Sequence, residues 1–207
     1  MDIERLRRAE AAFMERYPGG FEHPEMIERG RGHRIGRLVE RARTVLAPER
    51  FDDSERMAED IIKTVSSSSM VSIYEKPAFR DLVRSLSAKE RARLCSHVFQ
   101  LLHGDAESGF ESLSAFLAAG KMAKWTVMTV FPFYTNPKEE PFIKPTTAKE
   151  IIAFYRLEGL SYRPRPYWEF YSGYRDQLKA MMDSVSPLVA PDMGSFSAFL
   201  MIGAGAW

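Results

Sequence analysis

The groups best suited to binding chemistry are concentrated in residues 125–175, which hold thirteen of the 25 aromatic residues and six of the 12 prolines. Rings set beside rigid turns and cations favour a groove for a planar ligand or a partner, or a platform on which bases stack. The residues expected to be exposed and to bind are Lys144, Tyr162, Arg163, Arg165 and Trp168. The alternative is an irregular, ring-filled core, because Tyr167, Phe170, Tyr171 and Tyr174 follow a helical stripe.

A second candidate is a run of arginines. Six arginines fall between positions 29 and 43, with Glu40 as the only acid, and Arg34, Arg37 and Arg41 share one side of a predicted helix. Guanidinium groups in a row suit phosphates, because each presents a planar fork of donors. The competing interpretation is a solvated flank whose stems cover the edge of the core.

A carboxylate enzyme is the third interpretation. Acids that could do acid and base work are Glu75 with Asp81, and Glu59 with Asp60, near the serine run at positions 66–69. Such pairs catalyse only when their surroundings separate their pKa values. No histidine is near the serines in sequence and the G-x-S-x-G context is absent, so we assign no catalytic residue.

Metal and cofactor motifs are also absent. The four histidines are scattered, no two share a helix face at i, i+4, and Cys95 is the only cysteine. Cys95 falls on an apolar stripe and is expected to be an inert core thiol. Neither GxxxxGK[ST] nor GxGxxG occurs, so we predict no metal site and no cofactor.

The composition is that of an average globular protein. The 207 residues are 45% hydrophobic and 28% charged, with 29 basic against 28 acidic side chains. This near balance provides no global field toward nucleic acid or membrane. A charged N-terminus without an apolar region, no long apolar run and a lone cysteine predict a soluble, cytoplasmic protein without membrane contact.

Helical periodicity dominates the chain. It predicts a helix over residues 2–16, a second ending at Leu46, a third over 54–65, and others opening at Pro77 and at Ser87. Further helices are expected over 105–120, from a second capping box of Thr147 with Glu150 up to Gly159, from Pro166 through about five turns, and around Phe196. The first capping box is Ser87 with Glu90. The fold class is therefore mainly α, a multi-helix bundle with little or no sheet.

The domain prediction is a single helical domain over residues 1–207, with a weak seam near position 120. Residues 125–131 (WTVMTVF) are rich in β-branched and aromatic residues, which favours a strand, yet Trp125 and Met128 are spaced to line a helix. The residues expected to be in the core are Leu94, Cys95, Val98, Leu101, Phe110, Leu113, Tyr171 and Leu178.

The segments SSSSMVSIYEKPAFRD, AKWTVMTVFPFYTNP, IKPTTAK, YRPRPYWEFY and SFSAFLM together resemble an uncharacterised family of bacterial proteins of about this length. The resemblance spans nearly the whole chain. It implies a bacterial, soluble, self-contained protein and lends no functional residue. The KPT-type segments are also similar to proteins found with bacterial restriction systems, which favours nucleic acid as the alternative partner.

These observations favour a non-enzymatic helical protein that binds a protein or small-molecule partner through residues 125–175. The alternative is a nucleic-acid-binding protein of bacterial defence or DNA metabolism, using Arg34, Arg37 and Arg41 on phosphates. The carboxylate enzyme is the second alternative.

Overall fold

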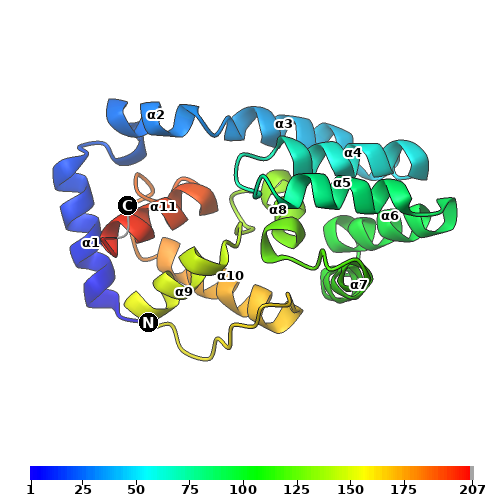
Figure 1. Cartoon of the computed structure of the whole chain (residues 1–207). Helices are drawn as coiled ribbons and strands as arrows, with labels where there is room; N and C mark the ends of the chain where they lie inside the picture. The colour runs from blue at the N-terminus through cyan, green and yellow to red at the C-terminus, as the bar shows by residue number, and fades with distance from the viewer. Residues whose placement is uncertain (206–207) are drawn as a thin grey trace. The chain divides into compact units, whose positions relative to one another are not determined.

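The structure is a computed structural model that describes residues 1–205. Within these residues it is 69% helical and has no strand, so the predicted mainly α fold is confirmed (Figure 1). The α-helices are α1 (Ile3–Arg16), α2 (Pro24–Arg31), α3 (Ile35–Val45), α4 (Ser54–Ser67), α5 (Glu75–Ser85), α6 (Ala88–His103), α7 (Ala106–Ala119), α8 (Trp125–Thr135), α9 (Pro145–Phe154), α10 (Trp168–Met182) and α11 (Met193–Gly203). Two short 3₁₀ turns cover Gly20–Glu22 and Pro48–Arg50.

The chain forms two compact units. Unit 1 comprises residues 1–32, 137–163 and 169–207, and unit 2 comprises residues 33–136 and 164–168. Their boundaries lie away from the expected seam near position 120. The prediction of a single domain stays a prediction.

Helix α8 is the core element of unit 2. Every residue from Trp125 to Tyr134 is buried, and α3, α4, α6 and α7 all contact the helix. A helix surrounded on all sides has no polar face, which is why its period could not be recognised as helical or extended from the sequence. Residues 125–131 are helical, and Pro132 lies inside the same helix.

Local signals define the ends of the helices in unit 2. Ser87 and Glu90 form the predicted capping box, in which Ser87 N–H donates to Glu90 Oε2 at 2.8 Å. Asp53 and Asp105 cap α4 and α7 through their carboxylates. The helices α6 and α7 then pack so closely that a Cβ added to Gly109 would lie 2.2 Å from the backbone nitrogen of Leu101.

Unit 1 is organised around the packing of α1, α9 and α11. The phenol of Tyr155 is fully buried and donates to the carbonyl of Leu200 at 3.1 Å, and the N–H of Asp2 donates to the carbonyl of Tyr155 at 2.7 Å. A Cβ added to Gly203 on α11 would lie 2.6 Å from the Cβ of Ala9 on α1. Small residues therefore set the close approach of these two helices.

The extended segment before α9 is fastened to α10 by a polar network. The buried Tyr171 donates its hydroxyl to Glu140 at 2.6 Å, and Arg175 lies 3.5 Å from the same carboxylate. Burial, followed by the nearby Glu140, raises the pKa of Tyr171 well above its ordinary value. Lys179 pairs with Glu139 one residue earlier. These contacts give this proline-rich segment a fixed path.

Four local predictions are wrong. Helix α9 ends at Phe154 and does not extend to Gly159. Thr147 does not open a helix, because α9 begins at Pro145 with Lys144 in the N-cap position and no capping side chain. The long C-terminal helix begins at Trp168, two residues after Pro166. Pro77 is the third residue of α5 and not its first. The eight predicted core residues are all buried.

Candidate functional site

The rings of residues 125–175 serve mainly the interior. Nine of the thirteen are buried: Trp125, Phe131, Phe133, Tyr134, Phe142, Tyr155, Phe170, Tyr171 and Tyr174. The other four, Phe154, Tyr162, Tyr167 and Trp168, are half-buried. Most rings of this segment therefore pack in the cores of the two units, and few reach the surface.

The five residues predicted to bind do not share a unit. Lys144, Tyr162 and Arg163 belong to unit 1, whereas Arg165 and Trp168 belong to unit 2.

The two rings among these five residues are half-buried. Lys149 lies over the ring of Tyr162 at 5.3 Å, and Phe170 meets its edge at 5.7 Å. Trp168 packs on Phe110 at 5.9 Å and donates its backbone N–H to Glu111. Lys144, Arg163 and Arg165 are exposed, as predicted.

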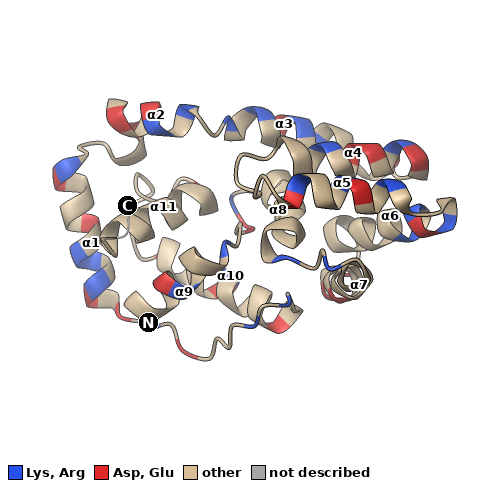
Figure 2. Cartoon of the chain, viewed as in Figure 1, with Lys and Arg blue, Asp and Glu red and all other residues tan. Residues whose placement is uncertain are grey.

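Of the three arginines of the alternative prediction, Arg37 and Arg41 lie on α3 and Arg34 directly precedes it. Basic residues recur along α3 (Figure 2). Arg34, Arg37 and Arg41 are all exposed. Arg34 occupies the N-cap position in the left-handed region, with φ 50°. The neighbouring Arg43 is used differently, since its Nε donates to the carbonyl of Thr135 at 2.9 Å.

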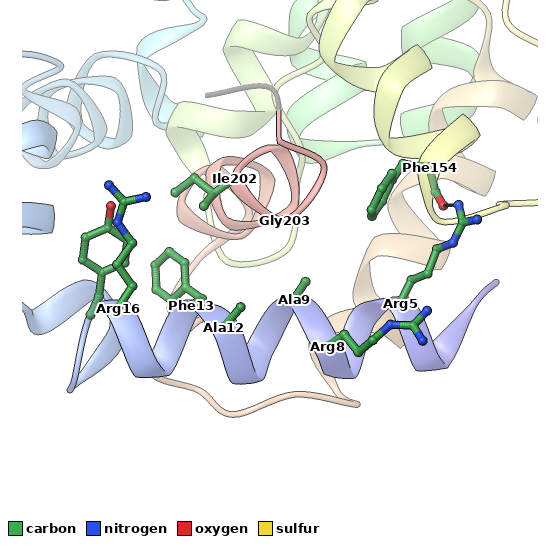
Figure 3. Close-up of a pocket in the computed structure, with 10 residues that line it drawn as sticks. Arg5, Arg8, Ala9, Ala12, Phe13, Arg16, Phe154, Ile202 and Gly203 are labelled. Atoms are coloured by element: carbon green, nitrogen blue, oxygen red, sulfur yellow. Dashed lines mark hydrogen bonds between the residues drawn. The ribbon is translucent and has the colours of Figure 1, made fainter.

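A groove that the sequence analysis did not predict runs along α1 in unit 1 (Figure 3). Its volume is about 520 Å³, and its lining residues are Arg5, Arg8, Ala9, Ala12, Phe13, Arg16, Tyr17, Phe154, Ile202 and Gly203. Ala9 and Ala12 form the middle of the groove on α1, and Ile202 and Gly203 face them from α11 (Figure 3). We call this feature the α1 groove.

Arginines stand at both ends of the α1 groove. Arg5 and Phe154 lie at one end and Arg16 at the other, with Arg8 beside Arg5 (Figure 3). Arg5 is held by the carbonyl of Phe154 at 2.6 Å and lies over the Phe154 ring at 5.2 Å. Arg16 lies over the ring of Tyr17 at 5.2 Å. Both guanidinium groups are therefore positioned by aromatic neighbours.

At the Arg5 end of the α1 groove, the carboxylate of Asp2 is paired with Arg5. Asp2 caps α1, and its carboxylate lies 3.2 Å from Arg5 and 3.9 Å from Arg156. The hydrogen bond from the backbone N–H of Arg5 lowers the pKa of Asp2, and the charges of Arg5, Arg156 and Arg8 lower it further. The ten lining residues of the groove, all in the described part of the chain, include no acid.

A second groove lies in unit 2 between α5, α6 and α7. It measures about 640 Å³ and is lined by Leu82, Leu86, Glu90, Arg93, His97, Ser112, Ala115, Phe116, Ala119 and Gly120. Arg93 lies over Phe116 at 5.9 Å, and the ring of His97 is 5.6 Å from the same ring. Burial, and then the charge of Arg93, lowers the pKa of His97. We call it the α6–α7 groove.

The acids of the enzyme hypothesis each have a partner of their own. Glu59 is paired with Arg84 at 3.1 Å, and Glu75 accepts a 2.7 Å hydrogen bond from Thr126. Asp81 is paired with Arg80 at 2.9 Å, and Asp60 lies 4.0 Å from Arg50. None of the four lines either groove.

Neither a metal-binding cluster nor an exposed thiol is found among the residues that the structure describes. Among residues 1–205, no group of three or more His, Cys, Asp or Glu side chains could hold a metal ion. Cys95 is buried, and burial raises the pKa of its thiol to about 12. No helix in the described range combines the length and apolar character that crossing a membrane requires.

The α1 groove had only a weak signal in the sequence. Arg5, Arg8, Ala12 and Arg16 share one side of a helix over residues 2–16, but Glu4 and Glu15 border that side, four residues before and seven residues after Arg8. A helical projection therefore mixes cations and acids and would not have singled out this face. It could not have found Phe154 or Gly203, which come from distant segments. Comparison with protein-family models, curated proteins and solved structures finds no match to the chain.

Proposed function

We propose that this protein is a non-enzymatic binding protein whose α1 groove accepts an acidic, partly apolar peptide segment of a partner protein. The observation that carries the proposal is the composition of the groove, in which three arginines and no acid surround an apolar floor. The partner belongs to the class predicted from the sequence, but the site lies outside most of residues 125–175. Phe154 is the one ring from that segment that lines the groove.

Charge favours an acidic occupant. Arg8 and Arg16 are exposed, and neither is in an ion pair with another described residue. Guanidinium groups bind carboxylates bidentately, and such charge-assisted hydrogen bonds are stronger than neutral ones. A basic or neutral segment would leave Arg8 and Arg16 without a compensating charge, whereas Arg5 is already paired with Asp2 at 3.2 Å.

Shape favours a peptide. Ala12, in the middle of the floor, is exposed, so the groove is open along its length and not an enclosed cavity. Arg5 and Arg16 lie eleven positions apart on α1, which is about 16 Å along the helix axis. An extended chain covers that length with about five residues. The expected segment therefore has acidic residues toward both ends and an apolar side chain between them, over Ala9 and Ala12.

The intracellular setting expected from the sequence belongs to the same proposal. One buried thiol that is not part of a disulfide fits a reducing compartment such as the cytoplasm. The partner that carries the peptide segment would then be another cytoplasmic protein.

The test is fluorescence anisotropy with a labelled, end-blocked hexapeptide of sequence Glu-Asp-Leu-Phe-Asp-Glu. We expect binding that weakens with salt, and a loss of about tenfold in affinity for R8E, because reversing a rim charge replaces attraction by repulsion. The matched control is R7E, since Arg7 is an exposed arginine of the same helix that does not line the groove. R7E should bind like the wild type.

Two further measurements assign the site. The same peptide with glutamine and asparagine in place of its acids should bind much more weakly. Amide chemical-shift changes caused by the acidic peptide should map to residues of α1, to Phe154 and to Gly203. Equal loss in R8E and R7E, no binding of the acidic peptide at low salt, or shift changes confined to other surfaces would each refute the proposal.

A further inference from the structure

Helix α3 carries a row of exposed cations that neither groove uses. Arg37 and Arg41 lie at i and i+4 on one side of α3, and Arg34 precedes them at the N-cap position. All three are exposed, and in the part of the chain that the structure describes none is in an ion pair or side-chain hydrogen bond. We call these three residues the α3 arginine row.

The row is distinct from the part of α3 that holds the helix in place. The helix contacts α4 and α8, and Ala42 and Leu46 are buried in that contact. Arg43 contributes to the same attachment through the carbonyl of Thr135. Because packing already fixes α3, binding a ligand to the exposed row would cost only the conformational entropy of the arginine side chains.

No local carboxylate neutralises the start of the row. The first turn of α3 contains no acidic residue, and its N-cap residue makes no capping hydrogen bond through its side chain. The positive end of the helix dipole lies there, which adds to the potential of Arg34 and Arg37. The region is therefore more positive than the formal net charge of +1 for the whole chain suggests.

The spacing of the row matches a line of phosphates. From Arg34 to Arg41 is seven residues, or about 10.5 Å along the helix axis. One strand of a duplex carries a phosphate about every 3.4 Å of axis, so the row spans about three phosphate-to-phosphate steps. We propose that the α3 arginine row binds the phosphodiester backbone of duplex nucleic acid, without reading its sequence.

A membrane surface fits the row less well. Interfacial helices bury their apolar face among lipids, whereas the apolar side of α3 lies against α4 and α8. What remains for a ligand is a narrow line of guanidinium groups. Such contacts position a protein on the backbone and carry no base specificity.

The experiment is a salt series of fluorescence anisotropy with a labelled random-sequence DNA duplex, beginning at low salt. Three phosphate contacts predict a slope of about −2.7 for log K against log salt, since each contact contributes about −0.9. The variant R37E/R41E should bind at least about tenfold more weakly and lose about two contacts' worth of slope.

The matched control is R56E/K89E, which makes the same change of net charge at two exposed residues on α4 and α6. It should keep most of the affinity and the wild-type slope. Circular dichroism of both variants checks that the helices are intact. No duplex binding at low salt, an equal loss in the control, or equal affinity for vesicles of anionic lipid that also depends on Arg37 and Arg41 would overturn the proposal.

Discussion

The two grooves are built alike but differ in charge, since one is lined by cations alone and the other by charges of both signs. Each is floored by alanine and glycine where helices approach closely, and each has an arginine over a phenylalanine: Arg5 over Phe154, and Arg93 over Phe116. The α1 groove is lined by three arginines and no acid, whereas the α6–α7 groove has Arg93, Glu90 and the titratable His97. Small residues thus create the shape, and the charged rim determines what the shape can hold.

A groove by itself does not indicate a ligand. Close helix packing on small side chains leaves a valley wherever it occurs. In the α6–α7 groove Glu90 is engaged by the capping box, where the hydroxyl and backbone of Ser87 lower the pKa of the glutamate. Glu90 of this lining therefore has a structural role in capping α6. In the α1 groove Arg5 is paired with Asp2 at 3.2 Å, whereas Arg8 and Arg16 have no ion-pair partner among the described residues.

The largest expected effect comes from filling the close helix contacts of the two units. Gly109→Ala would place a methyl group 2.2 Å from the backbone nitrogen of Leu101, and backbone cannot move aside without shifting α6 against α7. We expect a loss of about 3 kcal/mol or more in the free energy of unfolding, measured with urea. Gly203→Ala would place a methyl group 2.5 Å from the hydroxyl of the buried Tyr155 and 2.6 Å from the Cβ of Ala9, which is fixed to the backbone of α1, and should cost about 2–3 kcal/mol.

The control for these substitutions is Gly36→Ala on α3, where an added Cβ meets nothing within 4 Å. It should stabilise the protein by about 0.5–1 kcal/mol, since alanine loses less backbone entropy than glycine in a helix. If Gly109→Ala were as stable as the wild type, the close contact between α6 and α7 would be wrong.

A smaller effect separates shape from charge. Ala12→Leu keeps every charge of the α1 groove and fills its floor, so we expect at least about a tenfold loss in affinity for the acidic hexapeptide. Ala115→Leu makes the same change in the α6–α7 groove and should leave peptide binding unaltered. Both alanines are exposed, and leucine is nearly as good a helix former, so stability should change by less than about 0.5 kcal/mol. Peptide binding that survives Ala12→Leu would place the peptide elsewhere.

The sequence predicted what local signals control. The capping box of Ser87, the glycine after α6 and the stripe through Leu94, Val98 and Leu101 are all encoded within a few turns, and all are confirmed. The period of α8 could not be recognised, because a helix buried on every side shows no alternation of polar and apolar residues. Helix α2 was not predicted as a separate element. Its sequence contains Gly30 and ends before Gly32, and glycine lowers helix propensity.

The candidate site was less predictable than the fold, for a physical reason. Composition marked residues 125–175, but large rings stabilise cores as well as binding surfaces, and Trp125 and Tyr171 are nearly inaccessible. The α1 groove depends on contacts between residues almost two hundred positions apart, such as Ala9 and Gly203. No local pattern encodes such a pairing. The arginines at positions 34, 37 and 41 were recognised correctly as an exposed row because only one helix is needed to align them.

The smallest expected effect is a pH dependence that only the α6–α7 groove should show. The charged groups among its lining residues are Arg93 and Glu90 on the same helix as His97, and α5 and α7 contribute Leu82, Leu86 and Phe116 without charge. Burial and Arg93 lower the pKa of His97 in the folded state, so the unfolded chain binds a proton more readily.

Stability should therefore fall as the pH drops from above the ordinary histidine value of about 6.5 through the lower folded pKa, and should level off below it. His97→Gln should flatten this part of the profile in urea unfolding, and R93A should bring the pKa of His97, followed by its ring proton resonances, back toward the ordinary value. If wild-type His97 titrated at or above that value, its ring would be hydrated, and the packing of the α6–α7 groove would not favour the neutral imidazole.

Binding of the acidic hexapeptide should show no such pH dependence, since the α1 groove is lined by arginines, which keep their charge throughout this pH range. Its affinity should stay constant between about pH 7.5 and pH 6, where the peptide's own carboxylates also remain ionised.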